Sequence, residues 1–259
     1  RMKNVVFMMN VDLGKEGRFA SSRVNPYKYS IDSWKQWCEK NDCELFVLTD
    51  EVIDHDVMGI CWQRWYIFDL LESNDIEYNQ ILSVDADTII HPDCPNFFDK
   101  TENKFTVAYF DGSWDWVLRS LEAYSKYVFE GHMLKEWSKY FDSGFWIVNK
   151  THKPFAKRMT EFYHANSKLF REMEEKFLTG TEQTPLNFML DILKIDVKHL
   201  PYEFNMCDMN RKEILSEDLL FTKLGWIFQF NCIPNNKDNE LTDYWMKKTY
   251  NHFYGDYKE

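Results

Sequence analysis

The stretch Ile81-Leu82-Ser83-Val84-Asp85-Ala86-Asp87-Thr88-Ile89-Ile90 decides the fold class of this chain. A short apolar run such as residues 81–84 predicts a buried strand. Asp85 and Asp87 follow at once, so we expect two carboxylates at the carboxyl end of that strand. Open α/β sheets bind their ligands at this edge. Carboxylate oxygens suit Mg²⁺ or Mn²⁺, hard cations that bridge to phosphate oxygens, so the stretch predicts a site for a metal and a diphosphate.

A second Asp-x-Asp pattern, Asp54-His55-Asp56, lies in the polar stretch 50–56. No strand-like run precedes it, and a polar run of this kind predicts a solvated loop. The alternative for Asp85 and Asp87 is that they only turn the chain after the strand. Their position directly after an apolar run favours the ligand site.

Strand-like and helix-like segments alternate along the first half, which predicts a mostly parallel sheet with right-handed crossovers. In this half we expect strands over 5–11, 44–48, a run from 81 and 105–110, and helices over 27–40 and 61–71. In the second half we expect strands over 144–148, 195–200 and 226–230, and helices over 114–129, 153–177, 184–193 and 243–253. No linker or repeat is evident. We therefore predict a single α/β domain, 1–259, with a mostly parallel central sheet flanked by helices.

The chain has 259 residues, of which 44% are hydrophobic and 17% aromatic, as in packed globular proteins. Its net charge of -11 argues against a nucleic-acid partner, because neutralising phosphates requires a basic surface. No apolar run is long enough for a membrane span and no secretory signal precedes the first strand, so we expect a cytoplasmic protein. Scattered cysteines without a C-x-x-C pair predict reduced thiols. They are Cys38, Cys43, Cys61, Cys94, Cys207 and Cys232.

Five segments, in order along nearly the whole chain, resemble nucleotide-sugar glycosyltransferases of the GT-A fold, a Rossmann-like fold. They are the opening strand 5–11, Arg64 within 62–67, Ser83-Val84-Asp85-Ala86-Asp87-Thr88, Phe141-Asp142-Ser143-Gly144-Phe145-Trp146-Ile147-Val148-Asn149, and Glu182-Gln183-Thr184-Pro185-Leu186-Asn187. Within that fold the chain is most similar to family-8-type enzymes and their viral and bacterial relatives. The resemblance implies a nucleotide-sugar-binding half, 1–110, and an acceptor-binding half, 111–259.

The implied reaction moves a sugar from a nucleotide-diphosphate donor, UDP being favoured, to a glycan or other hydroxyl acceptor. A divalent cation, Mn²⁺ or Mg²⁺, would neutralise the leaving diphosphate as a Lewis acid. Arg64 would add a second positive charge. Asp50 would accept a hydrogen bond from the base, and Asn10 and Val11 would line the base and ribose. The full predicted donor set is Asn10, Val11, Asp50, Arg64, Asp85, Ala86, Asp87 and Gln183.

The predicted catalytic residues are Glu182 and Asp142. If the enzyme inverts configuration, Glu182 would take the proton of the acceptor hydroxyl, and Asp142 is the next candidate. If it retains configuration, Glu182 and Gln183 would bind the donor sugar and stabilise positive charge at its anomeric carbon. The alternative for Glu182 is an acid at a helix amino terminus.

The third metal ligand departs from the family pattern. Retaining relatives commonly place a histidine in a late His-x-x-Gly-x-x-Lys-Pro-Trp segment, whereas this chain has Gln229 there. We predict Asp85, Asp87 and Gln229 as the metal ligands. Asn231 and His252 are alternatives to Gln229, and a site with two protein ligands is another.

Other readings stay open at this stage. A haloacid-dehalogenase-like phosphatase would use Asp85 as nucleophile and Asp87 as acid/base, since those enzymes also end a strand in Asp-x-Asp-x-Thr. A sugar-nucleotide-binding protein without turnover is possible, and so is a nucleotidyltransferase with a basic loop at 14–18. Trp114 and Trp116 fit either an acceptor platform or the core.

Overall fold

The computed structural model describes residues 2–13, 25–110, 112–179 and 181–259, so the loop at 14–18 lies outside the described residues. Six strands form one sheet in the order β2-β1-β3-β6-β5-β7, and β4 pairs with β8 in a second sheet. The strands are β1 (Lys3–Met9), β2 (Cys43–Leu48), β3 (Tyr78–Val84), β4 (Thr88–Ile90), β5 (Phe105–Ala108), β6 (Phe145–Asn149), β7 (Val197–Leu200) and β8 (Ile227–Gln229).

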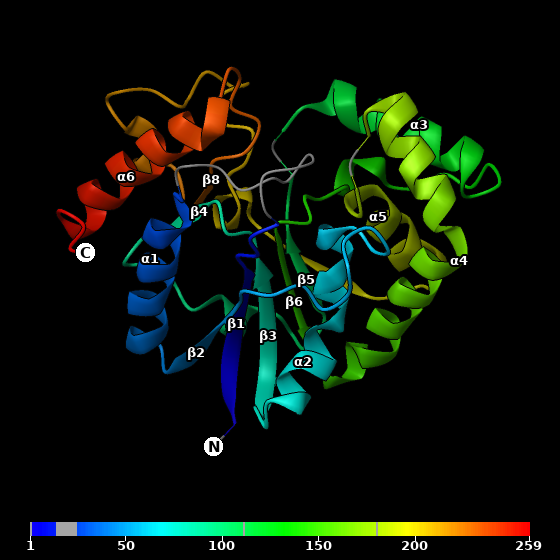
Figure 1. The fold of residues 1–259 in the computed structure, drawn as a ribbon, viewed down its shortest axis with the longest axis horizontal. Coiled ribbons are helices and arrows are strands. Elements are labelled where there is room, and N and C mark those ends of the chain that lie inside the picture. The colour runs from blue at the N-terminus through cyan, green and yellow to red at the C-terminus, as the bar shows by residue number, and fades with distance from the viewer. Residues whose placement is uncertain (1, 14–24, 111, 180) are drawn as a thin grey trace.

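Helices cover both sides of the large sheet, with α1 and α6 on one side and α3, α4 and α5 on the other (Figure 1). Their bounds are α1 (Tyr27–Lys40), α2 (Ile67–Ser73), α3 (Trp114–Tyr127), α4 (Lys153–Phe177), α5 (Gln183–Ile192) and α6 (Glu240–Tyr254). This mixed α/β architecture confirms the predicted fold class. The alternating pattern of β1 explains the two-sided cover, because Val5 and Phe7 enter one core cluster while Val6 and Met8 enter another.

Strand direction in the large sheet is mostly parallel, with one exception. β1 pairs in parallel with both β2 and β3, and β5 pairs in parallel with β7. β6 runs antiparallel to both β3 and β5. Since β1 lies between β2 and β3, the chain leaves β1 first to one side and later to the other, which creates the switch point where such sheets bind ligands.

One predicted helix differs in type from the one observed. The segment expected to be one helix over 61–71 begins as a 3₁₀ helix, η1 (Ile60–Tyr66), and only then continues as α2. The run expected to form a buried strand over 81–84 is the end of β3, and the chain resumes as β4 after the turn 85–87. The six cysteines are all free, as predicted. Within the described residues, no helix combines the length and the apolar character needed to cross a membrane.

Candidate active site

The turn Asp85–Asp87 follows β3 at the carboxyl edge of the sheet, as predicted, and its backbone is fixed by neighbours on other elements. The Asp85 amide donates to the carbonyl of Gly144 at 3.0 Å, next to the β3–β6 pairing. The Thr88 hydroxyl donates to the carbonyl of Asp85 at 2.7 Å and accepts from the Trp34 indole at 3.0 Å. The turn is therefore held by β6, β4 and α1 together.

The second sheet brings Gln229 to this turn. In the antiparallel pairing of β4 with β8, Gln229 lies opposite Thr88, and the Gln229 amide Nε2 donates to Asp85 Oδ2 at 2.9 Å. The other end of the amide, Oε1, is buried and has no hydrogen-bond partner within the described part of the chain. Asp87 also has one such oxygen, Oδ1. The structure thus brings together the three residues that the sequence singled out as metal ligands.

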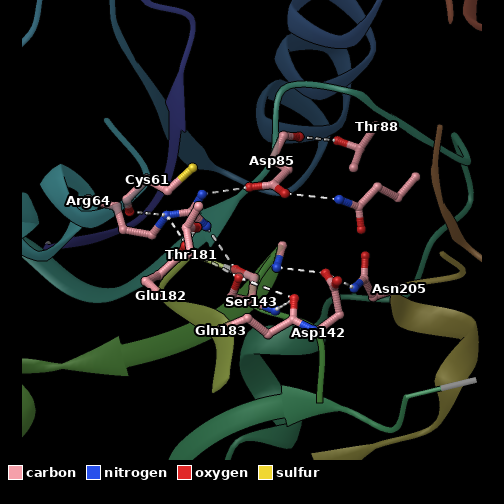
Figure 2. Close-up of polar contacts among 12 residues, drawn as sticks. Cys61, Arg64, Asp85, Thr88, Asp142, Ser143, Thr181, Glu182, Gln183 and Asn205 are labelled. Carbon is pink, nitrogen blue, oxygen red and sulfur yellow. Dashed lines mark hydrogen bonds and ion pairs between the residues drawn. The ribbon is translucent and has the colours of Figure 1, made fainter. Parts of the chain in front are cut away.

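Arg64 reaches the same turn from η1. Its Nη2 donates to Asp85 Oδ1 at 2.9 Å and its Nη1 to the Ser143 carbonyl at 2.8 Å. Its Nε donates to the Cys61 carbonyl at 3.0 Å and lies 3.4 Å from Glu182 Oε1 (Figure 2). All three guanidinium nitrogens therefore contact protein oxygens. In this arrangement Arg64 holds Asp85 and Glu182, and a contact to a diphosphate would require one of these bonds to be exchanged.

Glu182 lies deep in the site, with 2% of its surface exposed. Its Oε1 accepts from the Ser143 hydroxyl at 2.9 Å, and its Oε2 accepts from the Thr181 hydroxyl. Gln183 follows in the first turn of α5. Its Oε1 accepts from the Ser143 amide at 3.1 Å and its Nε2 donates to the Tyr140 hydroxyl at 3.1 Å. Both ends of this amide therefore hold the segment before β6 in place.

Asp142 lies on the other side of the cluster from Arg64 (Figure 2). Its Oδ1 accepts from the Gly144 amide at 2.7 Å and from Asn205 Nδ2 at 3.2 Å. A Cβ atom at Gly144 would lie 2.6 Å from Asp142 Oδ1 and 2.9 Å from Asp85 Oδ2. Glycine is therefore required between the two carboxylates, because a side chain there would collide with both.

The carboxylates raise one another's proton affinity. Burial raises the pKa of Asp87 to about 8, and the negative charges of Asp85 and Asp142 add to the shift. Burial likewise raises the pKa of Asp142 to about 7, with further contributions from Asp85 and Asp208. Burial also raises the pKa of the Tyr27 hydroxyl, with smaller contributions from the charges of Asp87 and Asp85.

The predicted base- and ribose-binding residues lie at the ends of two parallel strands. Asn10 and Val11 follow β1 directly, and the Asn10 amide donates to the Leu48 carbonyl at 2.9 Å. Asp50 lies two residues beyond β2, is exposed, and accepts from the Thr49 hydroxyl at 3.3 Å. The ends of β1 and β2 therefore share one edge of the sheet with Asp85, and the nucleoside-binding roles stay predictions.

The second Asp-x-Asp copy is exposed, as predicted for a solvated loop. Among the residues that the structure describes, Glu51, Asp54 and His55 are the one set of three acidic, histidine or cysteine side chains close enough to share an ion. His55 already contacts Glu51 at 3.0 Å. Asp85 and Asp87 do not form such a set, because the third ligand predicted for them is the amide oxygen of Gln229 and not an acidic, histidine or cysteine side chain.

One residue of the site, Asn205, was missed by the sequence analysis. It follows the 3₁₀ helix η5 (Tyr202–Phe204), just after the parallel strand β7. The end of a predicted parallel strand was a usable signal for Asn205. Trp114 and Trp116, which were considered for an acceptor platform, are both partly buried and pack against the core cluster that contains Val5 and Phe7. Trp114 also contacts Trp137 edge to face, with 5.4 Å between the ring centroids, and Trp137 is 46% exposed.

Comparisons with known proteins place the fold. No family model matches the chain, and no curated protein matches it. Among solved structures, a glycosyltransferase involved in the glycosylation of the major capsid of PBCV-1 matches with a TM-score of 0.54 at 8% identity, covering 92% of this chain and 98% of that chain. The galactosyltransferase LgtC, in complex with donor and acceptor sugar analogs, matches with a TM-score of 0.46 at 12% identity, covering 97% and 96%.

A third match is the glycosyltransferase GlyE of Streptococcus pneumoniae TIGR4, with a TM-score of 0.44 at 14% identity, covering 96% of this chain and 60% of that chain. Identities this low define the fold alone, and the PBCV-1 structure carries that conclusion because its TM-score exceeds 0.5. The chain therefore has the mixed α/β fold of a glycosyltransferase, with its acidic cluster at the carboxyl edge of the sheet.

Proposed function

We propose that the chain is a metal-dependent glycosyltransferase that moves a sugar from a nucleotide-diphosphate sugar, UDP-linked in the first instance, to a hydroxyl of a glycan or other acceptor. The observation that carries this proposal is the cluster Asp85, Asp87 and Asp142, which lies at the ligand-binding edge of a glycosyltransferase fold. Three partly buried carboxylates, of which Asp85 alone pairs with a guanidinium among the described residues, favour a bound cation and a ligand rich in hydrogen-bond donors.

The residues present fit a divalent cation. Asp87 Oδ1 and Gln229 Oε1 are buried oxygens without a hydrogen-bond partner, and a cation would satisfy both. Burial raises the pKa of Asp87, the neighbouring carboxylates add to the shift, and a bound cation would oppose both effects by favouring the ionised form. An all-oxygen set of Asp85, Asp87 and Gln229 suits Mg²⁺ or Mn²⁺. When bound, such a cation neutralises the charge that develops on the leaving diphosphate.

The protein groups have distinct roles in this proposal. Arg64 fixes the orientation of Asp85 and Glu182 by contacting both. Asp142 is the better base for an inverting reaction. It is only partly buried, and its pKa near 7 suits proton transfer at neutral pH. Glu182 is less suited because a guanidinium and two hydroxyls engage its oxygens and solvent barely reaches it.

The phosphatase alternative receives less support from the geometry. Hydrogen bonds to a carboxylate lower its nucleophilicity toward phosphorus, and both oxygens of Asp85 accept one, from Arg64 and from Gln229. A second lone pair on each oxygen stays available to a cation. The hydroxyl of Thr88 is directed to the carbonyl of Asp85 instead of toward a substrate phosphate.

The proposal is tested by incubating the protein with UDP-, GDP-, ADP- and dTDP-sugars and Mn²⁺ and measuring release of the nucleoside diphosphate. We expect slow hydrolysis of one nucleotide sugar, abolished by a chelator and by Asp87→Ala. A phosphatase would release phosphate from simple phosphate esters and leave the sugar–phosphate bond intact. A protein that binds the nucleotide sugar and never hydrolyses or transfers it would support the binding-protein alternative.

A further inference from the structure

Asn205 carries a buried oxygen without a partner. The residue is 3% exposed, and its Nδ2 donates to Asp142 Oδ1 at 3.2 Å. In this contact the amide nitrogen donates to the carboxylate, so Oδ1 lies at the other end of the amide. Oδ1 is enclosed and makes no hydrogen bond to any of the residues that the structure describes. Buried polar atoms are nearly always paired in native proteins, so an unpaired one beside a ligand site points to a ligand group.

The atoms around Asn205 define what that group must be. Asp142 and Asp85 flank Gly144, whose Cβ position lies within 3 Å of an oxygen of each. The unpaired oxygens of Asp87 and Gln229 lie in the same cluster. These groups are acceptors of hydrogen bonds or ligands of cations, so the complementary ligand is a cation or a hydroxyl donor. Figure 2 shows Asn205 next to Asp142, away from Arg64.

The two sides of Gly144 suit different ligands. Gln229 directs its amide nitrogen to Asp85, which keeps the Asp85–Asp87–Gln229 set on the cation side. Asn205 instead donates to Asp142, on the other side of Gly144. We propose that Asn205 Oδ1 accepts a hydrogen bond from a hydroxyl of the reacting saccharide, beside Asp142, and that this contact determines which sugars the protein uses. The inference rests on the proposed function and adds a specificity-determining residue to it.

The physical consequence is selectivity against deoxy sugars. A site that pairs a substrate hydroxyl with a buried acceptor rejects an analogue lacking that hydroxyl, since the acceptor is then left unpaired. The hydroxyl can belong to the transferred sugar or to the acceptor sugar. Both sources share this chemistry, and two sets of measurements separate them.

The donor measurements use calorimetry with Mn²⁺, UDP, UDP-glucose, UDP-galactose and their 2-, 3-, 4- and 6-deoxy forms. If the hydroxyl is on the donor, we expect one deoxy form to bind the wild-type protein about 10-fold or more weakly than its parent. The affinities of the Asn205→Ala protein for the parent nucleotide sugar and for the deoxy form should lie within about twofold of each other. The two proteins and the two ligands together form a double-mutant cycle. Affinity for UDP alone should not change.

The acceptor measurements use transfer to methyl glucoside and methyl galactoside and their deoxy forms. If the hydroxyl is on the acceptor, Asn205→Ala should bind UDP-sugars as the wild type does, while KM for the preferred acceptor rises about 10-fold. Asn236→Ala is the matched control. Its amide is engaged at both ends, donating to the Thr242 hydroxyl at 2.7 Å and accepting from the Leu241 amide at 2.9 Å, so its removal should lower stability and leave sugar discrimination intact.

The outcomes are distinguishable. A wild-type protein that binds nucleotide sugars but discriminates against no deoxy form of donor or acceptor overturns the inference, without any variant. An Asn205→Ala protein that loses Mn²⁺ or UDP affinity to the same extent as sugar affinity also overturns it, because Asn205 would then act on the cation or on folding. A wild-type protein that binds no nucleotide sugar removes the proposed function, and the inference falls with it.

Discussion

Arg64 and Asp85 form an ion pair that joins two segments far apart in sequence, with Nη2 2.9 Å from Oδ1 and the arginine side chain 9% exposed. The same guanidinium lies 3.4 Å from Glu182, so the positive charge of Arg64 compensates two carboxylates, one in the turn after β3 and one just before α5. Burying such charges is tolerated only when they are paired. The pair therefore couples the stability of the site to the geometry of the turn Asp85–Asp87.

Removal of Arg64 should destabilise the protein. Arg64→Ala leaves Asp85 and Glu182 without their shared cation, and we expect the free energy of unfolding to fall by about 3–5 kcal/mol, the range for breaking a buried pair. Urea denaturation measures this change. Arg158→Ala is the control, because Arg158 and Glu161 form an exposed pair at 3.9 Å that contributes under about 1 kcal/mol. Equal losses in the two variants would show that the Arg64 network is not important for stability.

The two aspartates of the turn should be required for binding of the cation. Asp85→Ala and Asp87→Ala are each expected to weaken Mn²⁺ binding by more than the roughly 10–100-fold that removal of an outer partner costs. Cation-dependent binding of UDP should be lost with it. Calorimetric titration of Mn²⁺ and UDP, with circular dichroism to monitor the fold, provides the measurement. If either variant is folded and binds Mn²⁺ and UDP as the wild-type protein does, the cation binds elsewhere.

The spacing between the carboxylates depends on Gly144. In Gly144→Ala the new methyl group would lie 2.6 Å from Asp142 Oδ1 and 2.9 Å from Gln229 Nε2. We expect a loss of about 1–3 kcal/mol in the free energy of unfolding, typical of overpacking, together with weaker Mn²⁺ binding. Gly59→Ala is the matched control, since its nearest neighbour would be 3.9 Å away. A Gly144→Ala protein with unchanged Mn²⁺ affinity would contradict the proposed arrangement.

The acidic cluster should make stability depend on pH when no cation is present. Asp87 has a pKa of about 8 in the folded protein, against an ordinary value of 3.8. Between pH 4 and pH 8 the folded protein keeps a proton on Asp87 that the unfolded chain has lost. The contribution of Asp87 to the free energy of unfolding is therefore most favourable below pH 4 and falls as the pH rises toward 8. Thermal unfolding in the presence of a chelator should show this decline, and Asp87→Asn should flatten it.

Mn²⁺ should oppose that decline, because the cation displaces the proton and binds more tightly as Asp87 ionises. The stabilisation that Mn²⁺ produces is therefore expected to be larger at pH 8 than at pH 6. Equal stabilisation at both values, or an unchanged pH profile in Asp87→Asn, would show that Asp87 is not the titrating group near the cation.

The fold was largely predictable from sequence, because each helix or strand is marked locally by its hydrophobic periodicity and by the residues that begin or end it. α1 and α4 have the bounds that were expected, the latter with Pro154 in its first turn. Strand direction was not predictable, since β6 carries the same apolar pattern whether it runs parallel or antiparallel to β3. The 3₁₀ geometry of η1 was missed for a related reason, because buried aromatics line both kinds of helix.

The site was predictable where a motif marked it and unpredictable where only the tertiary fold assembles it. Asp85 and Asp87 follow a recognisable strand, and Gln229 was found by alignment with the family's late segment. The contact of Arg64 with Glu182 joins residues whose sequence separation carries no local signal. Asn205 was missed because a lone asparagine after a short turn is more commonly a turn residue than a ligand residue.

The identity of the catalytic base is the sharpest remaining test of the site. A general base contributes about 10²–10⁴-fold in rate. If the product is inverted, we expect Asp142→Asn to lower turnover by this amount while donor affinity stays near that of the wild type. Glu182→Gln should have a smaller effect on turnover, because Arg64 and Ser143 already engage Glu182.

NMR of the anomeric proton of the product reports the stereochemistry independently of either variant. For a retained product neither residue acts as a base, and both changes should instead alter binding of the donor sugar. An inverted product made at the normal rate by Asp142→Asn, together with an inactive but folded Glu182→Gln protein, would assign the proton transfer to Glu182. The ion pair between Arg64 and Glu182 would then have to open before the acceptor is deprotonated.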